Sequence, residues 1–271
     1  MLLRLFEHAQ VYHPDRVLDP VEVKRAGSFE DVYFTTKDGF QINGWFFTAR
    51  PGSPRKHLCV LVCHGNAGNV SHRVDLCNSL LRTGVSVFSF DYRGFGRSEG
   101  RPSEEGTYLD GAAAIKWLAT KDIEASNTIA FGESLGGGIG SELAIRFPLA
   151  GLVLQSTFTS IPDIGAELFP WLPVKWLATI KYDTFSRLPQ IHCPVMVIHS
   201  RDDGLAGFHH SEKNFARANE PKLFWETKGD HGDMLMDQPH FVEGMEKFIR
   251  MVERHRAVSA GSRRSPAVRN P

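Results

Sequence analysis

The sequence has no run of about 18 consecutive apolar residues, so we expect no transmembrane helix. The apolar start, Met1 to Phe6, is too short for the hydrophobic region of a secretory signal, and no small-residue cleavage site follows it. We expect a short helix there that packs on the domain. The alternative is a weak peripheral membrane contact through the side chains of Leu2, Leu3, Leu5 and Phe6.

A surplus of charge is also lacking, because Lys plus Arg and Asp plus Glu number 31 each. Without a basic surplus, nothing favours binding to nucleic acid or to an anionic membrane. Cysteine is scarce, with four in 271 residues and none in a C-x-x-C pair, which excludes a disulfide framework. We expect reduced thiols and a cytoplasmic protein. The four are Cys59, Cys63, Cys77 and Cys193.

The signatures of common cofactors are missing as well. Gly94, Gly96 and Gly100 do not have the G-x-G-x-x-G spacing of a dinucleotide site, and no phosphate-binding loop with its lysine occurs. The twelve histidines include the pair His209-His210, but none has a zinc-site spacing such as H-E-x-x-H. We therefore expect no cofactor and no catalytic metal.

What the sequence does contain is an alternation of strand-like and helix-like segments. This alternation predicts an α/β fold with a mostly parallel sheet flanked by helices. Asp38-Gly39 predicts a hairpin turn that makes the first two strands antiparallel at one edge. The expected strands are residues 32–36, 42–47, 59–63, 85–90, 128–131, 152–155, 195–199 and 222–226, and the expected helices are residues 74–82, 108–120, 137–147 and 241–255.

One stretch, residues 157–190, interrupts the alternation. It holds six aromatic residues and four prolines and is too long for a plain connection. We interpret it as a small cap insertion, with a longer crossover helix packed on the sheet as the alternative. We further expect an N-terminal extension over residues 1–30, an α/β domain over residues 31–256, and a disordered tail over residues 257–271, which is rich in Ser, Arg, Pro and Gly.

The most informative motif is Gly132-Glu133-Ser134-Leu135-Gly136, which matches the G-x-S-x-G turn around a nucleophilic serine. An apolar strand precedes it and a helical segment follows it, which is the context this motif requires. The glycines leave room for a serine in a strained backbone conformation. We expect Ser134 to be a nucleophile, and the alternative is a glycine-rich turn that holds an ordinary serine.

A nucleophilic serine needs a base, and the base needs an acid that orients it. In proteins with this turn, the acid follows a late strand and the histidine follows the last strand. Asp202 and Asp203 both follow the expected strand 195–199, and either could serve as the acid. His231 follows the expected strand 222–226 and is the candidate base.

An oxyanion formed at this serine needs two backbone N–H donors. One should come from Leu135, the residue directly after the serine. The other should come from the loop after an early central strand, which here is His64-Gly65-Asn66-Ala67-Gly68-Asn69. We assign this second donor to Asn66, while a plain turn of Gly and Asn is the alternative.

Together these motifs resemble the α/β-hydrolase superfamily, over roughly residues 31–253. The branch they are most similar to is the set of α/β-hydrolase domain-containing proteins related to the serine aminopeptidase-like hydrolases. In that branch the acid lies four residues after the histidine of the late strand, which implies Asp203. The loop that follows, residues 204–207, departs from the acidic or polar residue, two aliphatic residues and proline that are usual there. The matching runs are His64 to Asn69, Asp91 to Ser98, Gly132 to Gly136, His199 to Asp203 and Gly229 to His231.

The motifs and the resemblance lead us to expect a serine hydrolase of the carboxylesterase or thioesterase kind. It would cleave a small-molecule ester or thioester through an acyl-enzyme, and the aromatic cap suggests an apolar acyl or aryl group. An aminopeptidase-like amide hydrolase is one alternative, and it would need an acidic group to hold the amine of the substrate. A non-catalytic binding module with the same fold is the other, although the chain retains both Ser134 and His231.

Overall fold

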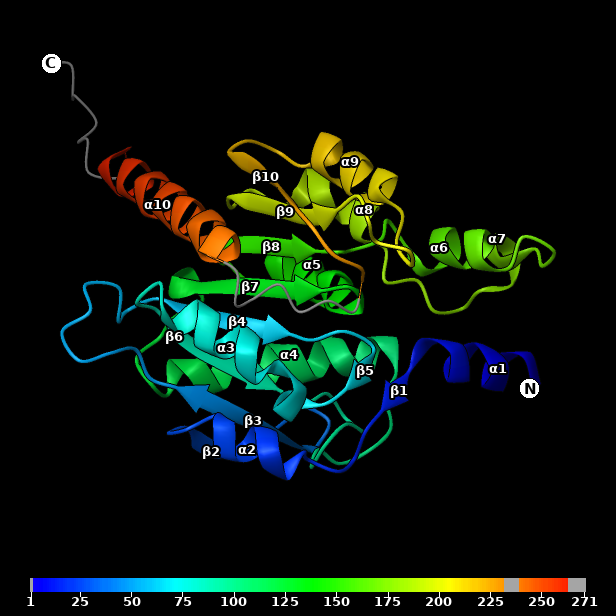
Figure 1. The fold of residues 1–271 in the computed structure, drawn as a ribbon, viewed down its shortest axis with the longest axis horizontal. Helices are drawn as coiled ribbons and strands as arrows, with labels where there is room; N and C mark the ends of the chain where they lie inside the picture. Colours follow the sequence, from blue (N-terminus) through cyan, green and yellow to red (C-terminus); the bar gives the residue numbers. More distant parts are fainter. Residues whose placement is uncertain (1, 232–238, 263–271) are drawn as a thin grey trace, which may run out of the picture.

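The computed structural model of the chain describes residues 2–231 and 239–262. Its centre is an eight-stranded sheet with the order β10-β9-β8-β7-β4-β6-β3-β2 (Figure 1). All pairings from β10 to β6 are parallel, and β3 runs antiparallel to both β6 and β2 at one edge. The mostly parallel sheet with an edge hairpin is therefore confirmed. The strands are β2 Glu30–Thr35, β3 Gln41–Phe47, β4 Cys59–Cys63, β6 Ser86–Phe90, β7 Thr128–Glu133, β8 Gly151–Gln155, β9 Val195–Ser200 and β10 Lys222–Thr227.

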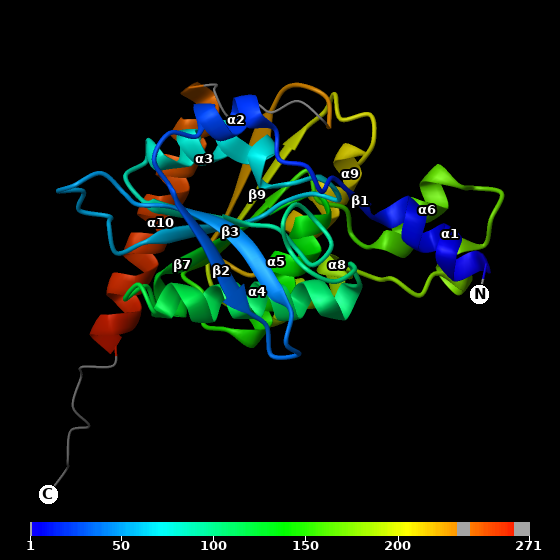
Figure 2. The same ribbon diagram turned by 90° about the horizontal axis from the view of Figure 1, so that it is seen from below.

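Helices cover both faces of the sheet, so its central strands are buried on both sides, as unbroken apolar strands require (Figure 2). Helices α2, α3 and α10 pack on one face, and α4, α5, α8 and α9 lie on the other. The bounds are α2 Pro20–Arg25, α3 Val74–Leu81, α4 Glu104–Ala119, α5 Leu135–Arg146, α8 Thr184–Arg187, α9 Phe208–Arg217 and α10 Pro239–Ser262. Short 3₁₀ helices are η1 Val70–Arg73, η2 Ala125–Asn127 and η3 Leu188–Gln190.

Five neighbouring parallel strands, in the order β10-β9-β8-β7-β4, end at the same side of this sheet, and predicted site residues follow four of them. Ser134 directly follows β7, and Asn66 follows β4, the strand paired with it. Asp203 follows β9, and His231 follows β10, which pairs with β9. Ligands of open parallel sheets bind outside this edge, so the topology alone brings the predicted site residues to one end of the molecule.

The segment of residues 157–190 extends from the same end of the sheet, after β8. The stretch 157–190 holds α6 Ile161–Leu168 and α7 Val174–Leu177 before it returns to the sheet through α8. The first helix, α1 Leu2–Val11, lies beside α6 in both views (Figures 1 and 2). Directly after α1, β1 His13–Pro14 pairs with β5 Ala67–Gly68 in a second, two-stranded parallel sheet.

The C-terminal helix extends further than the sequence analysis predicts. Helix α10 continues to Ser262, past residue 257, where the predicted disordered tail begins. Its apolar face is buried against the sheet, and Arg256 donates a hydrogen bond to the side chain of Asn127 at this end of the helix. Residues 263–271 of the predicted tail lie outside the described residues. Trp171 and Trp176, two aromatic residues of the stretch 157–190, are 75% and 92% exposed and belong to no core.

No described helix is both long and apolar enough to cross a bilayer. The four cysteines are free thiols, as expected, and three of them lie buried in the sheet or against it. Burial raises the pKa of the Cys77 thiol to about 12, which makes it a poor nucleophile.

Candidate active site

Ser134 occupies a sharp turn between β7 and α5 with a φ of 52°. A non-glycine residue with this backbone conformation is strained, and such strain is typical of functional positions. The glycines on either side allow the close packing around it. A Cβ on Gly136 would lie 1.9 Å from the carbonyl oxygen of Cys63, and one on Gly132 would lie 2.5 Å from that of Gly136. The turn therefore excludes larger residues at both positions and presents the serine, which is 7% exposed.

His231 connects Ser134 to Asp203. Its Nε2 lies 3.0 Å from Ser134 Oγ, and its Nδ1 lies 2.8 Å from Asp203 Oδ2. Asp203 is buried, whereas its neighbour Asp202 is exposed. Burial alone would raise the pKa of the Asp203 carboxyl, but hydrogen bonds from His199, His231 and the Ala206 amide outweigh it and hold this pKa well below its usual value. Asp203 is therefore ionised and accepts a hydrogen bond from the Nδ1–H group of His231.

A second histidine holds Asp203 from the opposite side. His199, at the end of β9, is fully buried, and its Nε2 lies 3.1 Å from Asp203 Oδ2 and 2.8 Å from the carbonyl oxygen of Ala206. Its Nδ1 is paired with the hydroxyl of Ser211. Sequence reasoning used His199 as a position marker for the acid and missed this contact. The four-residue spacing to Asp203 was the available signal.

The loop after Asp203 is held firmly despite its two glycines. Oδ1 of Asp203 accepts hydrogen bonds from the N–H groups of Leu205 and Ala206, at 3.0 and 2.8 Å. Oδ1 of Asp230 accepts from the N–H groups of Gly204 and His231, at 2.9 and 2.7 Å. Asp230 thus links the loop after Asp203 to the main chain of His231. The sequence did not indicate this role.

The two predicted oxyanion donors flank Ser134. Leu135 and Asn66 line the same cavity as Ser134, the first at the start of α5 and the second in the loop after β4. An ion pair ties that loop to the serine turn, because Arg73 Nε lies 2.7 Å from Glu133 Oε2. Arg73 also donates to the carbonyl oxygen of Ala67, next to Asn66, at 3.2 Å. The arrangement brings together all five predicted site residues or their main chain: Ser134, Asp203, His231, Asn66 and Leu135.

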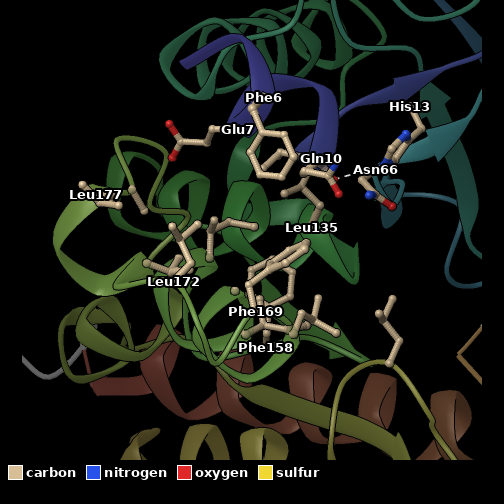
Figure 3. Close-up of a pocket in the computed structure, with 18 of the residues that line it drawn as sticks. Phe6, Glu7, Gln10, His13, Asn66, Leu135, Phe158, Phe169, Leu172 and Leu177 are labelled. Carbon is tan, nitrogen blue, oxygen red and sulfur yellow. Dashed lines mark hydrogen bonds between the residues drawn. The ribbon is translucent and has the colours of Figure 1, made fainter. Parts of the chain in front are cut away.

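A largely apolar cavity of about 450 Å³ has Ser134 among its lining residues. Figure 3 shows side chains that line this cavity. Its volume is typical of a small-molecule site. Aromatic and aliphatic side chains from the stretch 157–190 form one side, among them Phe158, Phe169, Leu172 and Leu177, and α1 forms the opposite side. Trp171 and Trp176 are not part of this lining. The aromatic residues of the stretch therefore divide between the cavity and the exposed surface.

One cluster has the residue types of a metal site, namely Glu167 on α6 with His209 and His210 on α9. However, Nδ1 of His210 accepts the backbone N–H of Thr159 at 3.2 Å, so the ring proton of the neutral imidazole lies on Nε2. That Nε2 faces Glu167 at 3.2 Å and donates to it, and a protonated ring nitrogen cannot bind a metal ion. These contacts are better described as a hydrogen-bonded link between α6 and α9.

Comparison with known proteins finds relatives and solved structures that are similar to this chain. The profile of the family described as "Serine aminopeptidase, S33" matches residues 54–184. The chain is 39% identical over 222 residues to the protein Rv2307c of Mycobacterium tuberculosis, covering 81% of this chain and 78% of that protein. It is 30% identical over 209 residues to the alpha/beta hydrolase domain-containing protein WAV2 of Arabidopsis thaliana, covering 70% of this chain and 67% of that protein. The esterase Pf2001 of Pyrococcus furiosus superposes with a TM-score of 0.72 at 21% identity, covering 89% of this chain and 97% of that chain, which shows a shared fold.

Proposed function

Because the chain belongs to the α/β-hydrolase superfamily, we propose that it is a serine hydrolase that cleaves carboxylic esters or thioesters through an acyl-enzyme. The observation that carries this proposal is the contact chain from Ser134 Oγ to His231 Nε2, at 3.0 Å, and from His231 Nδ1 to Asp203 Oδ2, at 2.8 Å. This is the order of nucleophile, base and orienting acid that acyl transfer needs.

In the first half of the reaction, Ser134 Oγ attacks the carbonyl carbon of the substrate while His231 Nε2 takes the hydroxyl proton. Asp203 stabilises the resulting imidazolium, and the amides of Asn66 and Leu135 stabilise the oxyanion. The bond to the alkoxide or thiolate then breaks, and His231 returns the proton to this leaving group. In the second half, His231 takes a proton from water, the hydroxide attacks the acyl carbon, and Ser134 leaves with that proton. The scheme requires no cofactor.

The aminopeptidase alternative draws support from the description of the matching family, but the cavity argues against it. A peptidase that releases N-terminal residues needs a carboxylate to hold the ammonium group of its substrate. Among the described lining residues, Glu7 is the only carboxylate. Both of its oxygens already accept hydrogen bonds, from the N–H groups of Thr179 and Ile180 at 2.7 and 2.9 Å and from the Thr179 hydroxyl at 2.6 Å.

A panel of substrates tests the proposal directly. We expect hydrolysis of p-nitrophenyl esters and thioesters and covalent labelling by a fluorophosphonate probe, with much slower release from aminoacyl anilides. Faster cleavage of the anilides than of the esters would favour the peptidase. A folded protein that neither reacts with the probe nor cleaves any substrate would favour a non-catalytic binding module.

A further inference from the structure

The cavity beside Ser134 is completed by the N-terminal helix. Leu3, Phe6 and Val11 of α1 contribute apolar side chains to its wall. The ring of Phe6 meets that of Phe169 edge to face, with the centroids 6.1 Å apart, so a direct contact joins α1 to the wall that the stretch 157–190 forms (Figure 3). Without α1, the apolar side chains of the stretch 157–190 would have no opposite wall.

Helix α1 is fixed to the opposite wall rather than loosely placed over it. The Glu7 carboxylate accepts three hydrogen bonds from Thr179 and Ile180, which follow α7 in the chain. At the end of α1, the hydroxyl of Tyr12 lies 3.0 Å from that of Tyr182, and both residues are buried. These contacts satisfy the Glu7 carboxylate with donors of the chain itself, and most of the other lining residues of the cavity are apolar.

The residues after α1 reach the predicted oxyanion loop. The N–H of His13 donates to the carbonyl oxygen of Asn66 at 2.8 Å, and the N–H of Asp15 donates to that of Gly68 at 3.2 Å. In return, Asn69 Nδ2 donates to the carbonyl oxygen of Val17 at 2.8 Å. The pairing of β1 with β5 thereby fixes the main chain around Asn66, whose amide the proposed mechanism uses.

From these contacts we propose that residues 2–15 form a specificity element of the active site. Helix α1 forms one wall of a binding site for the apolar acyl chain of an ester or thioester, and β1 positions the oxyanion loop for the carbonyl group of the same substrate. This inference rests on the proposed function. It selects substrates with an acyl group long enough to reach Phe6, and it disfavours charged acyl groups because most of the described lining is apolar.

Two neighbouring substitutions on α1 test the wall. Phe6 lines the cavity, whereas Leu5, which is 60% exposed, does not. The measurement is kcat/KM for acetyl, butyryl and octanoyl p-nitrophenyl esters. We expect Phe6→Ala to lower the octanoyl-to-acetyl ratio by about tenfold, the size of effect that lost contacts in an apolar pocket produce. Leu5→Ala should change the ratio less than twofold. Equal losses for all chain lengths in Phe6→Ala, or equal shifts in both variants, would overturn the proposal.

A second pair of variants tests β1. His13→Pro removes the N–H that holds Asn66, whereas His13→Ala keeps it. We expect kcat of the proline variant to be at least about tenfold below that of the alanine variant for every chain length, with similar KM values, because a displaced oxyanion donor acts on the transition state. Equal kcat values would refute the positioning role. If His13→Pro does not fold, Asn69→Ala tests the positioning role of β1 instead. This variant removes the reciprocal contact to Val17 and should lower kcat in the same way.

A binding measurement separates this inference from the proposed function. Octanoate is titrated calorimetrically into the Ser134→Ala protein with and without Phe6→Ala. Weaker binding in the double variant supports the acyl site even if the parent protein hydrolyses no ester, in which case the proposed function alone fails. Equal binding in both proteins refutes the acyl site even if esters are cleaved.

Discussion

Nε2 of His199 lies 3.1 Å from Oδ2 of Asp203, the same oxygen that accepts a hydrogen bond from Nδ1 of His231. His199 is fully buried, and its Nε2 also faces the carbonyl oxygen of Ala206. One imidazole therefore fixes both the carboxylate and the loop that follows it. A carboxylate that is held from two sides keeps its orientation toward the base, which is what preorganised catalysis requires.

We expect His199→Leu to lower kcat by roughly 10- to 100-fold, because a small displacement of a catalytic group has an effect of this size. KM should change little, since His199 does not line the cavity. His199→Gln, whose side-chain N–H can donate to Asp203, should recover part of the loss. Steady-state kinetics with short-chain esters, alongside thermal unfolding, checks this. A Leu variant with normal kcat, or a Gln variant as slow as the Leu variant at equal stability, would contradict a positioning role.

Ser134→Ala should remove esterase activity and fluorophosphonate labelling while the protein stays folded. The turn already accommodates a small residue there, and the loss should reach roughly 10⁴-fold or more, as in other enzymes that lose a member of such a triad. The check is turnover of p-nitrophenyl acetate beside a circular dichroism spectrum. Activity within tenfold of the parent would mean that another residue is the nucleophile.

The two aspartates after β9 offer a matched comparison. Asp203→Asn should lower kcat by roughly 10³-fold or more, because an amide does not stabilise the imidazolium that forms in the transition state. Asp202→Asn should leave kcat within about threefold, since this side chain is exposed, whereas the contact chain described above runs through Asp203. Measured kcat values in the reverse order would assign the acid to Asp202.

The depressed pKa of the Asp203 carboxyl predicts how stability depends on pH. A carboxyl whose pKa is lowered by folding stabilises the native state above its unfolded pKa of about 3.9, and this stabilisation is lost as the pH falls from there through the lower folded pKa. The parent should therefore be more stable than Asp203→Asn by a constant amount between pH 7 and about pH 5. The difference should shrink below about pH 4. Urea unfolding of both proteins across this range is the measurement, and a difference that grows on acidification would contradict the sign.

The cavity wall predicts which aromatic residues determine acyl-chain preference. Phe169→Ala should weaken cleavage of octanoyl esters relative to acetyl esters by roughly 1–3 kcal/mol in transition-state free energy, because Phe169 lines the cavity. Trp176→Ala should have no such effect, because this side chain is 92% exposed and lies outside the lining. Chain-length profiles of the two variants decide the point, and a selective loss in the tryptophan variant would show that Trp176 reaches the substrate.

The sequence predicted the parts of this fold that depend on local patterns. Apolar runs such as residues 59–63 and 195–199 identify buried strands, and five consecutive residues around Ser134 predict the turn that holds it. The contacts of His13 with Asn66 and of Glu7 with Thr179 join segments far apart in the chain, and no local pattern encodes them. Hydrophobic composition also failed to separate Phe169, which lines the cavity, from Trp176, because large apolar residues are common on protein surfaces.

The ion pair between Arg73 and Glu133 joins the loop that carries Asn66 to the turn that carries Ser134, and both side chains are largely shielded from solvent. Dissolved ions screen exposed charge pairs strongly and shielded pairs much less. In the proposed mechanism, this contact helps to set the distance between the Ser134 hydroxyl and the Asn66 amide. We therefore expect that distance to depend little on ionic strength.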